Sequence, residues 1–175
     1  LACPALPTCG LALSEAERFM PSLLPQLERA FASLGLENEA PVVRITGCPN
    51  GCARPYTAEV GIVGRSGDNY VLYLGGSHLG TRLGFVVADL VRGKEIIPTL
   101  YPTLIAFRSE RESGEHFGDF CHRLGREPQA LDGRVVGDDH GTEHGRDVLD
   151  ARRLRELLIR HRGVGGAEVQ GLLRD

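Results

Sequence analysis

The chain has 175 residues, 42% of them apolar and 25% charged, and its formal net charge is −3. This length and composition are typical of a globular domain with one substantial core. The slightly acidic balance gives no reason to expect a nucleic-acid or membrane partner, and no apolar run approaches the roughly 20 residues of a membrane-crossing helix. The sequence lacks an initiator Met, and we expect the remainder of the same polypeptide to be missing.

A first helix is predicted to begin at Ser14, because Ser14 and Glu17 match a capping box. Apolar residues then recur at helical spacing until Gly35, which is a natural stop. Pro21 and Pro25 interrupt this stretch, so we expect either a kink or two abutting helices.

The strands are predicted in the middle of the chain. Residues 42–46 form a buried strand, and residues 58–64 and 69–75 form a β-hairpin around a turn of polar residues and glycine. Residues 85–91 are predicted as a further strand, although their continuous apolar run also fits the start of a helix.

A helix bent at Pro102 is predicted over residues 94–111, and a short segment over 117–124 is expected to pack back on the core. This order of elements predicts an α+β fold in which helices cover the strands and the hairpin, with the loops that carry Cys3, Cys9, Cys48 and Cys52 at one face. Residues 1–125 carry all of these predicted elements. Residues 126–175 form a C-terminal extension of unknown role.

Within the extension, residues 126–147 are rich in Gly and Asp and are predicted to contribute little to the core, whereas residues 147–162 are predicted to be helical. His140, Glu143 and His144 match a zinc-peptidase pattern that works only on a helix. The surrounding glycines argue against a helix, so we expect a solvated loop without catalytic metal.

Two closely spaced cysteines, Cys48 and Cys52, follow the strand at 42–46 in a tight loop. Pro49 fixes one φ angle of this loop, and Gly51 lets the backbone pass close to a bulky group. Backbone amides turned inward in such a loop donate hydrogen bonds to sulfur and offset negative charge.

Cys3 and Cys9 lie in a Pro- and Gly-rich loop at the start of the chain and complete the pattern Cys-x5-Cys-x38-Cys-x3-Cys. The odd total of five cysteines does not suit a complete disulfide framework, which favours metal-bound thiolates in a reducing compartment. The spacing alone favours a [4Fe–4S] cluster and a structural zinc ion about equally. The fifth cysteine, Cys121, is interpreted as a small buried thiol.

The second cysteine loop lies within a run that resembles the signature of sirohaem-dependent sulfite reductases. That run is Ile45-Thr46-Gly47-Cys48-Pro49-Asn50-Gly51-Cys52-Ala53-Arg54-Pro55-Tyr56. The resemblance spans about residues 1–125 and does not extend to residues 126–175. Flanking blocks agree with it in order: Ser14-Glu15-Ala16-Glu17-Arg18, Ala58-Glu59-Val60-Gly61-Ile62-Val63-Gly64, Leu74-Gly75-Gly76 and Phe117-Gly118-Asp119-Phe120.

This resemblance implies the C-terminal portion of an assimilatory sulfite reductase haemoprotein of the nitrite/sulfite reductase family. It implies that Cys3, Cys9, Cys48 and Cys52 hold a [4Fe–4S] cluster, and that Cys52 also binds the sirohaem iron and is the catalytic position. The family reaction is the six-electron reduction of sulfite to sulfide, with ferredoxin or an NADPH-dependent flavoprotein as electron donor. The family binds its substrate anion mostly through basic residues of the N-terminal portion, so we expect this chain alone to be inactive.

Asn50 and Arg54 flank Cys52 and are the other candidate cofactor-binding residues. Asn50 equally fits a turn position, and Arg54 equally fits a surface cation. Three alternatives stay open: a sirohaem nitrite reductase, in which Ser is more frequent at the position of Gly51, an electron-transfer module without sirohaem, and a zinc-stabilised interaction domain. We expect a cytoplasmic location, or a plastid one in a plant or alga.

Overall fold

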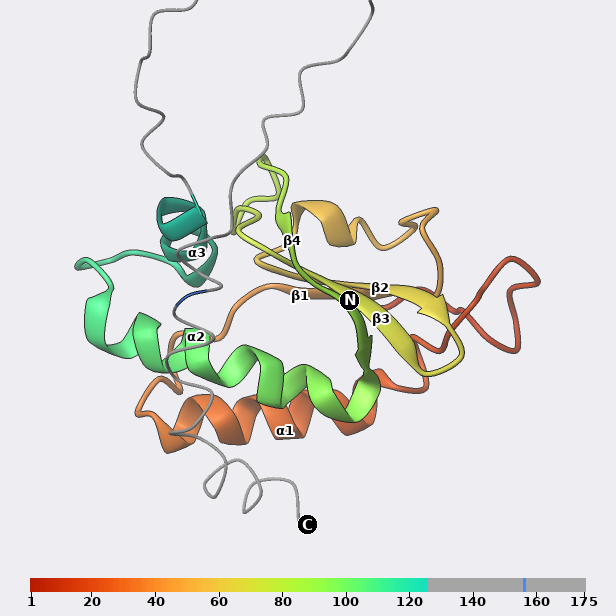
Figure 1. The fold of residues 1–175 in the computed structure, drawn as a ribbon, viewed down its shortest axis with the longest axis horizontal. Helices are drawn as coiled ribbons and strands as arrows, with labels where there is room; N and C mark the ends of the chain where they lie inside the picture. Colours follow the sequence, from red (N-terminus) through yellow and green to blue (C-terminus); the bar gives the residue numbers. More distant parts are fainter. Residues whose placement is uncertain (126–155, 157–175) are drawn as a thin grey trace, which may run out of the picture.

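The computed structural model describes residues 1–125 and Glu156 (Figure 1). Its centre is a four-stranded sheet in the order β1-β2-β3-β4, in which β1 and β2 run parallel and the other neighbours run antiparallel. This mixed sheet with helices confirms the α+β expectation. The strands are β1 (Val43–Thr46), β2 (Val60–Ser66), β3 (Asn69–Leu74) and β4 (Phe85–Arg92).

The predicted hairpin is confirmed as β2 and β3, with Gly67 in the turn at a φ of +56° that glycine adopts without strain. The segment that fitted both a strand and a helix is the strand β4. In its first residues Phe85 and Val87 are buried while Val86 between them is exposed, which is the period-two pattern of a strand with one covered face.

Within residues 1–125, three α-helices complete the core: α1 (Met20–Ser33), α2 (Ile96–Glu110) and α3 (Phe117–Gly125). The 3₁₀ turn η1 (Pro55–Thr57) follows the second cysteine loop. A second 3₁₀ turn, η2 (Gly93–Glu95), directly precedes α2. Helices α1 and α2 lie side by side on one side of the sheet (Figure 1). Phe107 of α2 packs edge-on against Phe117 and Phe120 of α3, which confirms that the short last segment packs back on the core.

The predicted helix start at Ser14 is wrong, because α1 begins at Met20. Ser14 is fully buried in extended chain, where its N–H donates to the Gly47 carbonyl (2.9 Å) and its hydroxyl donates to the Asn69 carbonyl (3.2 Å). Pro21 instead occupies the first turn of α1, where its missing N–H costs no intrahelical bond.

Helix α1 continues through Pro25, so the alternative of two abutting helices is wrong. Pro25 is exposed, and water can therefore satisfy the Pro21 carbonyl that loses its helical donor. Among the described residues, none of the helices combines the length and apolar character that crossing a membrane requires. The expectations for residues 126–147, for the helix at 147–162 and for the His140–His144 pattern lie outside the described residues, apart from Glu156, which is helical.

Candidate metal-cluster site

The first cysteine is held against β1 by backbone hydrogen bonds. The N–H of Cys3 donates to the Ile45 carbonyl (3.1 Å), and the N–H of Ile45 donates to the Leu1 carbonyl (3.0 Å). The start of the chain therefore runs alongside the strand that leads into the second cysteine loop. The Gly47 N–H also donates to the Cys3 sulfur (3.3 Å), the kind of amide-to-sulfur bond that stabilises a thiolate ligand.

The segment that follows Cys9 returns to the same glycine. The N–H of Ala12 donates to the Cys9 carbonyl (3.1 Å), and the N–H groups of Leu13 and Ser14 then donate to the Gly47 carbonyl (2.8 and 2.9 Å). Both sides of the first cysteine loop are thus bonded to Gly47, directly before Cys48. The sequence-predicted pairs are brought to one region of the fold.

No side chain fits at Gly47. A Cβ built there would lie 2.5 Å from the Ser14 carbonyl oxygen and 2.6 Å from the Ala5 Cβ. Both neighbours belong to the segment that carries Cys3 and Cys9. Glycine is therefore required at this position by the close approach of the two cysteine-bearing segments, and its φ plays no part.

The loop from Cys48 to Cys52 is closed by an aromatic anchor. The Tyr56 hydroxyl donates to the Pro49 carbonyl (2.6 Å), and the Tyr56 ring packs edge-on against Tyr73 of β3 at 5.2 Å between centroids. Partial burial, followed by Tyr73 and Cys48, raises the pKa of Tyr56, so its hydroxyl remains a donor at neutral pH. Gly51 passes beneath this ring with a φ of +67°.

The four cysteines differ in exposure. Cys48 is buried, Cys3 and Cys9 are partly buried, and Cys52 is exposed. Asn50 and Arg54, the other predicted cofactor-binding residues, are exposed on the same loop. Arg54 adopts the left-handed conformation (φ 53°, ψ 51°), in which its N–H donates to the Gly51 carbonyl (2.7 Å).

Cys121 lies apart from these loops in α3. It is completely buried in the hydrophobic core, and this burial raises the pKa of its thiol well above the ordinary value. The interpretation as a small buried thiol is confirmed.

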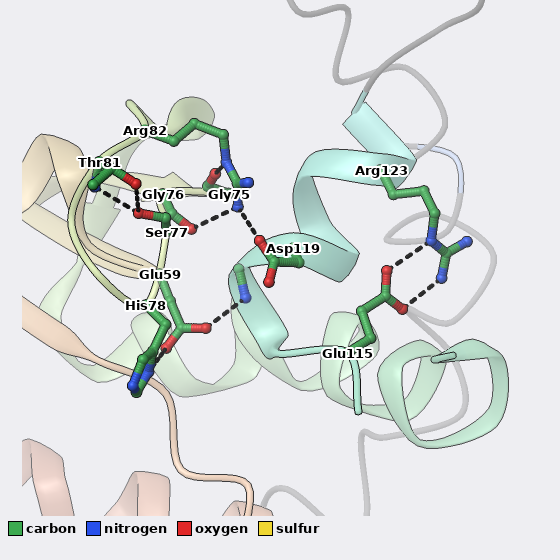
Figure 2. A network of polar contacts seen from close by, with 11 residues as sticks. Glu59, Gly75, Gly76, Ser77, His78, Thr81, Arg82, Glu115, Asp119 and Arg123 are labelled. Atoms are coloured by element: carbon green, nitrogen blue, oxygen red, sulfur yellow. Dashed lines mark hydrogen bonds and ion pairs between the residues drawn. The ribbon is translucent and has the colours of Figure 1, made fainter. Parts of the chain in front are cut away.

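The sequence did not single out Glu59, a carboxylate that is only 1% exposed. Its Oε2 accepts from the Val42 N–H (2.8 Å) and its Oε1 accepts from the Gly118 N–H (2.9 Å), so it joins the start of β2 to α3. Figure 2 shows this carboxylate beside His78. The only sequence signal was a lone charge between Ala58 and the apolar run of β2.

Arg82 was also missed, and it connects the loop after β3 to α3 (Figure 2). Its guanidinium donates to the carbonyls of Gly75 (2.8 Å) and Gly76 (3.1 Å) and to the Asp119 carboxylate (2.7 Å). These contacts tie the backbone of Gly75 and Gly76 to α3.

The residues present fit a [4Fe–4S] cluster. All four predicted ligands are free thiols, they lie on two loops joined at Gly47, and a backbone N–H already donates to one sulfur. A mixed sheet that carries four free cysteines on two linked loops has the features of a class of proteins with a cysteine-bound metal centre.

Comparisons with known proteins narrow this class. No protein-family model matches the chain. The sulfite reductase [NADPH] hemoprotein beta-component of Methylobacterium nodulans is 53% identical over 142 residues, which are 81% of this chain and 24% of that protein. The protein of the same description from Staphylococcus carnosus is 47% identical over 134 residues, or 77% of this chain and 24% of the relative.

The fold is also similar to that of a solved structure. That of the Mycobacterium tuberculosis NirA protein superposes with a TM-score of 0.55 at 27% identity, over 70% of this chain and 24% of that one. The chain spans about a quarter of the length of the proteins it matches. It belongs to the nitrite/sulfite reductase family.

Proposed function

We propose that this chain supplies the cluster-binding part of a sulfite reductase, which reduces sulfite to sulfide with six electrons. The observation that carries this proposal is the joining of two free-cysteine loops at Gly47 in a chain about half identical to proteins named sulfite reductase hemoprotein. Because the matched segment makes up only about a quarter of these relatives, we further propose that the substrate anion is bound mainly by residues outside this chain, and that the chain alone is inactive.

The proposed cofactors are a [4Fe–4S] cluster and sirohaem. Cys3, Cys9, Cys48 and Cys52 would hold the cluster, and Cys52 would share its sulfur with the sirohaem iron. If bound, this pair of cofactors would provide single-electron transfer from the cluster to the sirohaem, where sulfite would be reduced. The exposure of Cys52, in contrast to the buried Cys48, supports its assignment as the ligand that faces a second group.

The residues of this chain would prepare the site in three ways. The Gly47 N–H donates to the Cys3 sulfur and disperses its negative charge. Tyr56 fixes the loop between Cys48 and Cys52 through the Pro49 carbonyl. Arg54, a cation exposed near Cys52 in sequence, would pair with the carboxylates of sirohaem, and Asn50 would contact the same group.

The electron donor is proposed to be an NADPH-dependent flavoprotein, since the names of the relatives include NADPH. Ferredoxin is the alternative donor. A donor-independent assay therefore serves the test of function best: oxidation of reduced methyl viologen with sulfite, and separately with nitrite, as the acceptor.

The decisive comparison uses the holoenzyme with Cys52→Ser, Cys9→Ser and Cys121→Ala. Serine is a harder and more weakly donating ligand than thiolate. We expect Cys52→Ser to lower sulfite reduction by orders of magnitude and to alter both the haem spectrum and the cluster signal. Cys9→Ser should affect the cluster signal first, and Cys121→Ala should leave both spectra and turnover near wild type because Cys121 lies in the core.

An unaltered haem spectrum in Cys52→Ser would make the shared-thiolate assignment wrong, and the haem ligand would then be sought at Cys48. Wild-type holoenzyme that reduces nitrite but not sulfite would contradict the proposed substrate.

A further inference from the structure

We propose that Glu59, His78 and His116 form a second metal site, which binds a divalent first-row transition ion of the Zn²⁺ type and is distinct from the cysteine loops. The three side chains each place a ligand atom within 4.8 Å of the other two. They come from three separate segments: the residue before β2, the loop after β3 and the residue before α3. The fold, and not local sequence, brings them together.

The carboxylate is oriented in advance. Glu59 is 1% exposed, and backbone N–H groups of Val42 and Gly118 bond its two oxygens at 2.8 and 2.9 Å. Oxygen Oε2 also lies 3.7 Å from Nδ1 of His78. Figure 2 shows the Glu59 and His78 side chains next to each other. A ligating carboxylate held by such outer hydrogen bonds needs little reorganisation to bind an ion, because each oxygen keeps a second lone pair.

The two histidines supply accessible nitrogen ligands. Both residues are exposed, with 48% of the His78 side chain open to solvent. Their rings stack nearly parallel, 4.5 Å apart between centroids and 13° between planes. The stacking keeps the two rings together, and each ring has a nitrogen within 4.8 Å of a Glu59 carboxylate oxygen.

The spacing fits an ion after a small movement. Bonds of about 2.0–2.1 Å to a tetrahedral ion put ligand atoms about 3.4 Å apart. Ligand atoms that already lie within 4.8 Å therefore need to approach by at most about 1.4 Å, which exposed imidazoles achieve by rotation.

The ligand set selects the class of ion. Two imidazoles and one carboxylate suit Zn²⁺, Co²⁺ or Ni²⁺, whereas Mg²⁺ and Ca²⁺ take oxygen ligands. Three protein ligands leave at least one position for water. A bound ion would tie the loop after β3 and the start of α3 to the beginning of β2. It would therefore add to the bonds that Glu59 and Arg82 already make between these segments.

The test uses the cofactor-loaded holoenzyme, so that the cluster occupies its four cysteines, and Zn²⁺ alone as the probe. Isothermal titration should show one ion per chain, and zinc K-edge absorption should show a nitrogen and oxygen shell with imidazole scattering and no sulfur. His78→Ala and His116→Ala should each weaken Zn²⁺ binding by about tenfold or more. His140→Ala/His144→Ala, which also removes two histidines, is the matched control and should leave the affinity unchanged.

Absence of stoichiometric Zn²⁺ binding to the wild-type holoenzyme would overturn the proposal. Sulfur ligands around the bound zinc would also overturn it. So would Zn²⁺ binding that is lost in His140→Ala/His144→Ala but kept in both His78→Ala and His116→Ala. Circular dichroism without added metal checks the fold of each variant, and the absorption measurement on wild type decides the ligands independently of any variant.

Discussion

Replacement of Glu59 by alanine tests how much a single buried carboxylate contributes to this fold. The side chain is 1% exposed and accepts hydrogen bonds from the backbone N–H groups of Val42 (2.8 Å) and Gly118 (2.9 Å). Alanine removes both acceptors and leaves both donors without their partner. The hydrogen bond from the Gly118 N–H is buried, and the one from the Val42 N–H is partly buried.

A hydrogen bond to a charged partner contributes about 1.5–3 kcal/mol, so the loss of two predicts about 3–6 kcal/mol of lost unfolding free energy for Glu59→Ala. Glu59→Gln keeps one acceptor oxygen and presents an amide donor to the second N–H. We therefore expect about half of that loss.

The assay is urea unfolding followed by far-ultraviolet circular dichroism, with a chelator present so that no metal contributes. Glu39→Gln is the matched control, since Glu39 pairs with Arg111 at 2.7 Å but both side chains are about one-third exposed. Such a pair contributes less than about 1 kcal/mol. A Glu59→Ala loss no larger than that of the control, with an unchanged denaturant slope, would refute the role given to Glu59.

Two further predictions concern the cysteine region and the acid side of the stability profile. Gly47→Ala should lower the iron and sulfide content of the holoenzyme, because its Cβ meets Ser14 and Ala5 at 2.5 and 2.6 Å, whereas Gly10→Ala, with nothing within 4 Å, should not. The Arg123 guanidinium lowers the pKa of Glu115 below its ordinary 4.5, so this ion pair stabilises the fold above that pH and loses its effect as the pH falls further. Glu115→Gln should therefore flatten the fall of Tm below about pH 4.5, and an unchanged acid limb would contradict this.

The strands were predictable because their signals are local. β2 and β3 are runs of β-branched and aromatic residues separated by a glycine-containing turn, and this pattern is sufficient for a hairpin. The helix start was not predictable in the same way. Ser14 matches a capping box locally, but its N–H and hydroxyl are used by Gly47 and Asn69, which are distant in sequence. A long-range contact overrode the local preference.

In the candidate site, too, local sequence predicted some features, whereas others depend on contacts between distant segments. The spacing of Cys3, Cys9, Cys48 and Cys52 indicated candidate metal ligands from the sequence alone, and the resemblance favoured a cluster over zinc; the assignment stays a prediction. The spacing carried no information on which sulfur is exposed, since exposure depends on how the loop after β1 lies on the rest of the chain. The contacts of Glu59 were invisible for a related reason: its partners are backbone N–H groups, which leave no trace in side-chain sequence.

Gly47 is the residue at which fold and chemistry meet. It follows the last residue of β1, its carbonyl accepts from Leu13 and Ser14, and its N–H donates to the Cys3 sulfur. The two cysteine pairs are separated by 38 residues, and bringing such distant segments together costs loop-closure entropy. Here the free energy gained from the sheet and from these backbone hydrogen bonds offsets the loop-closure entropy during folding. A cluster would then bind to loops that are already joined, and preorganisation of this kind keeps its binding energy available for holding the metal and tuning its properties.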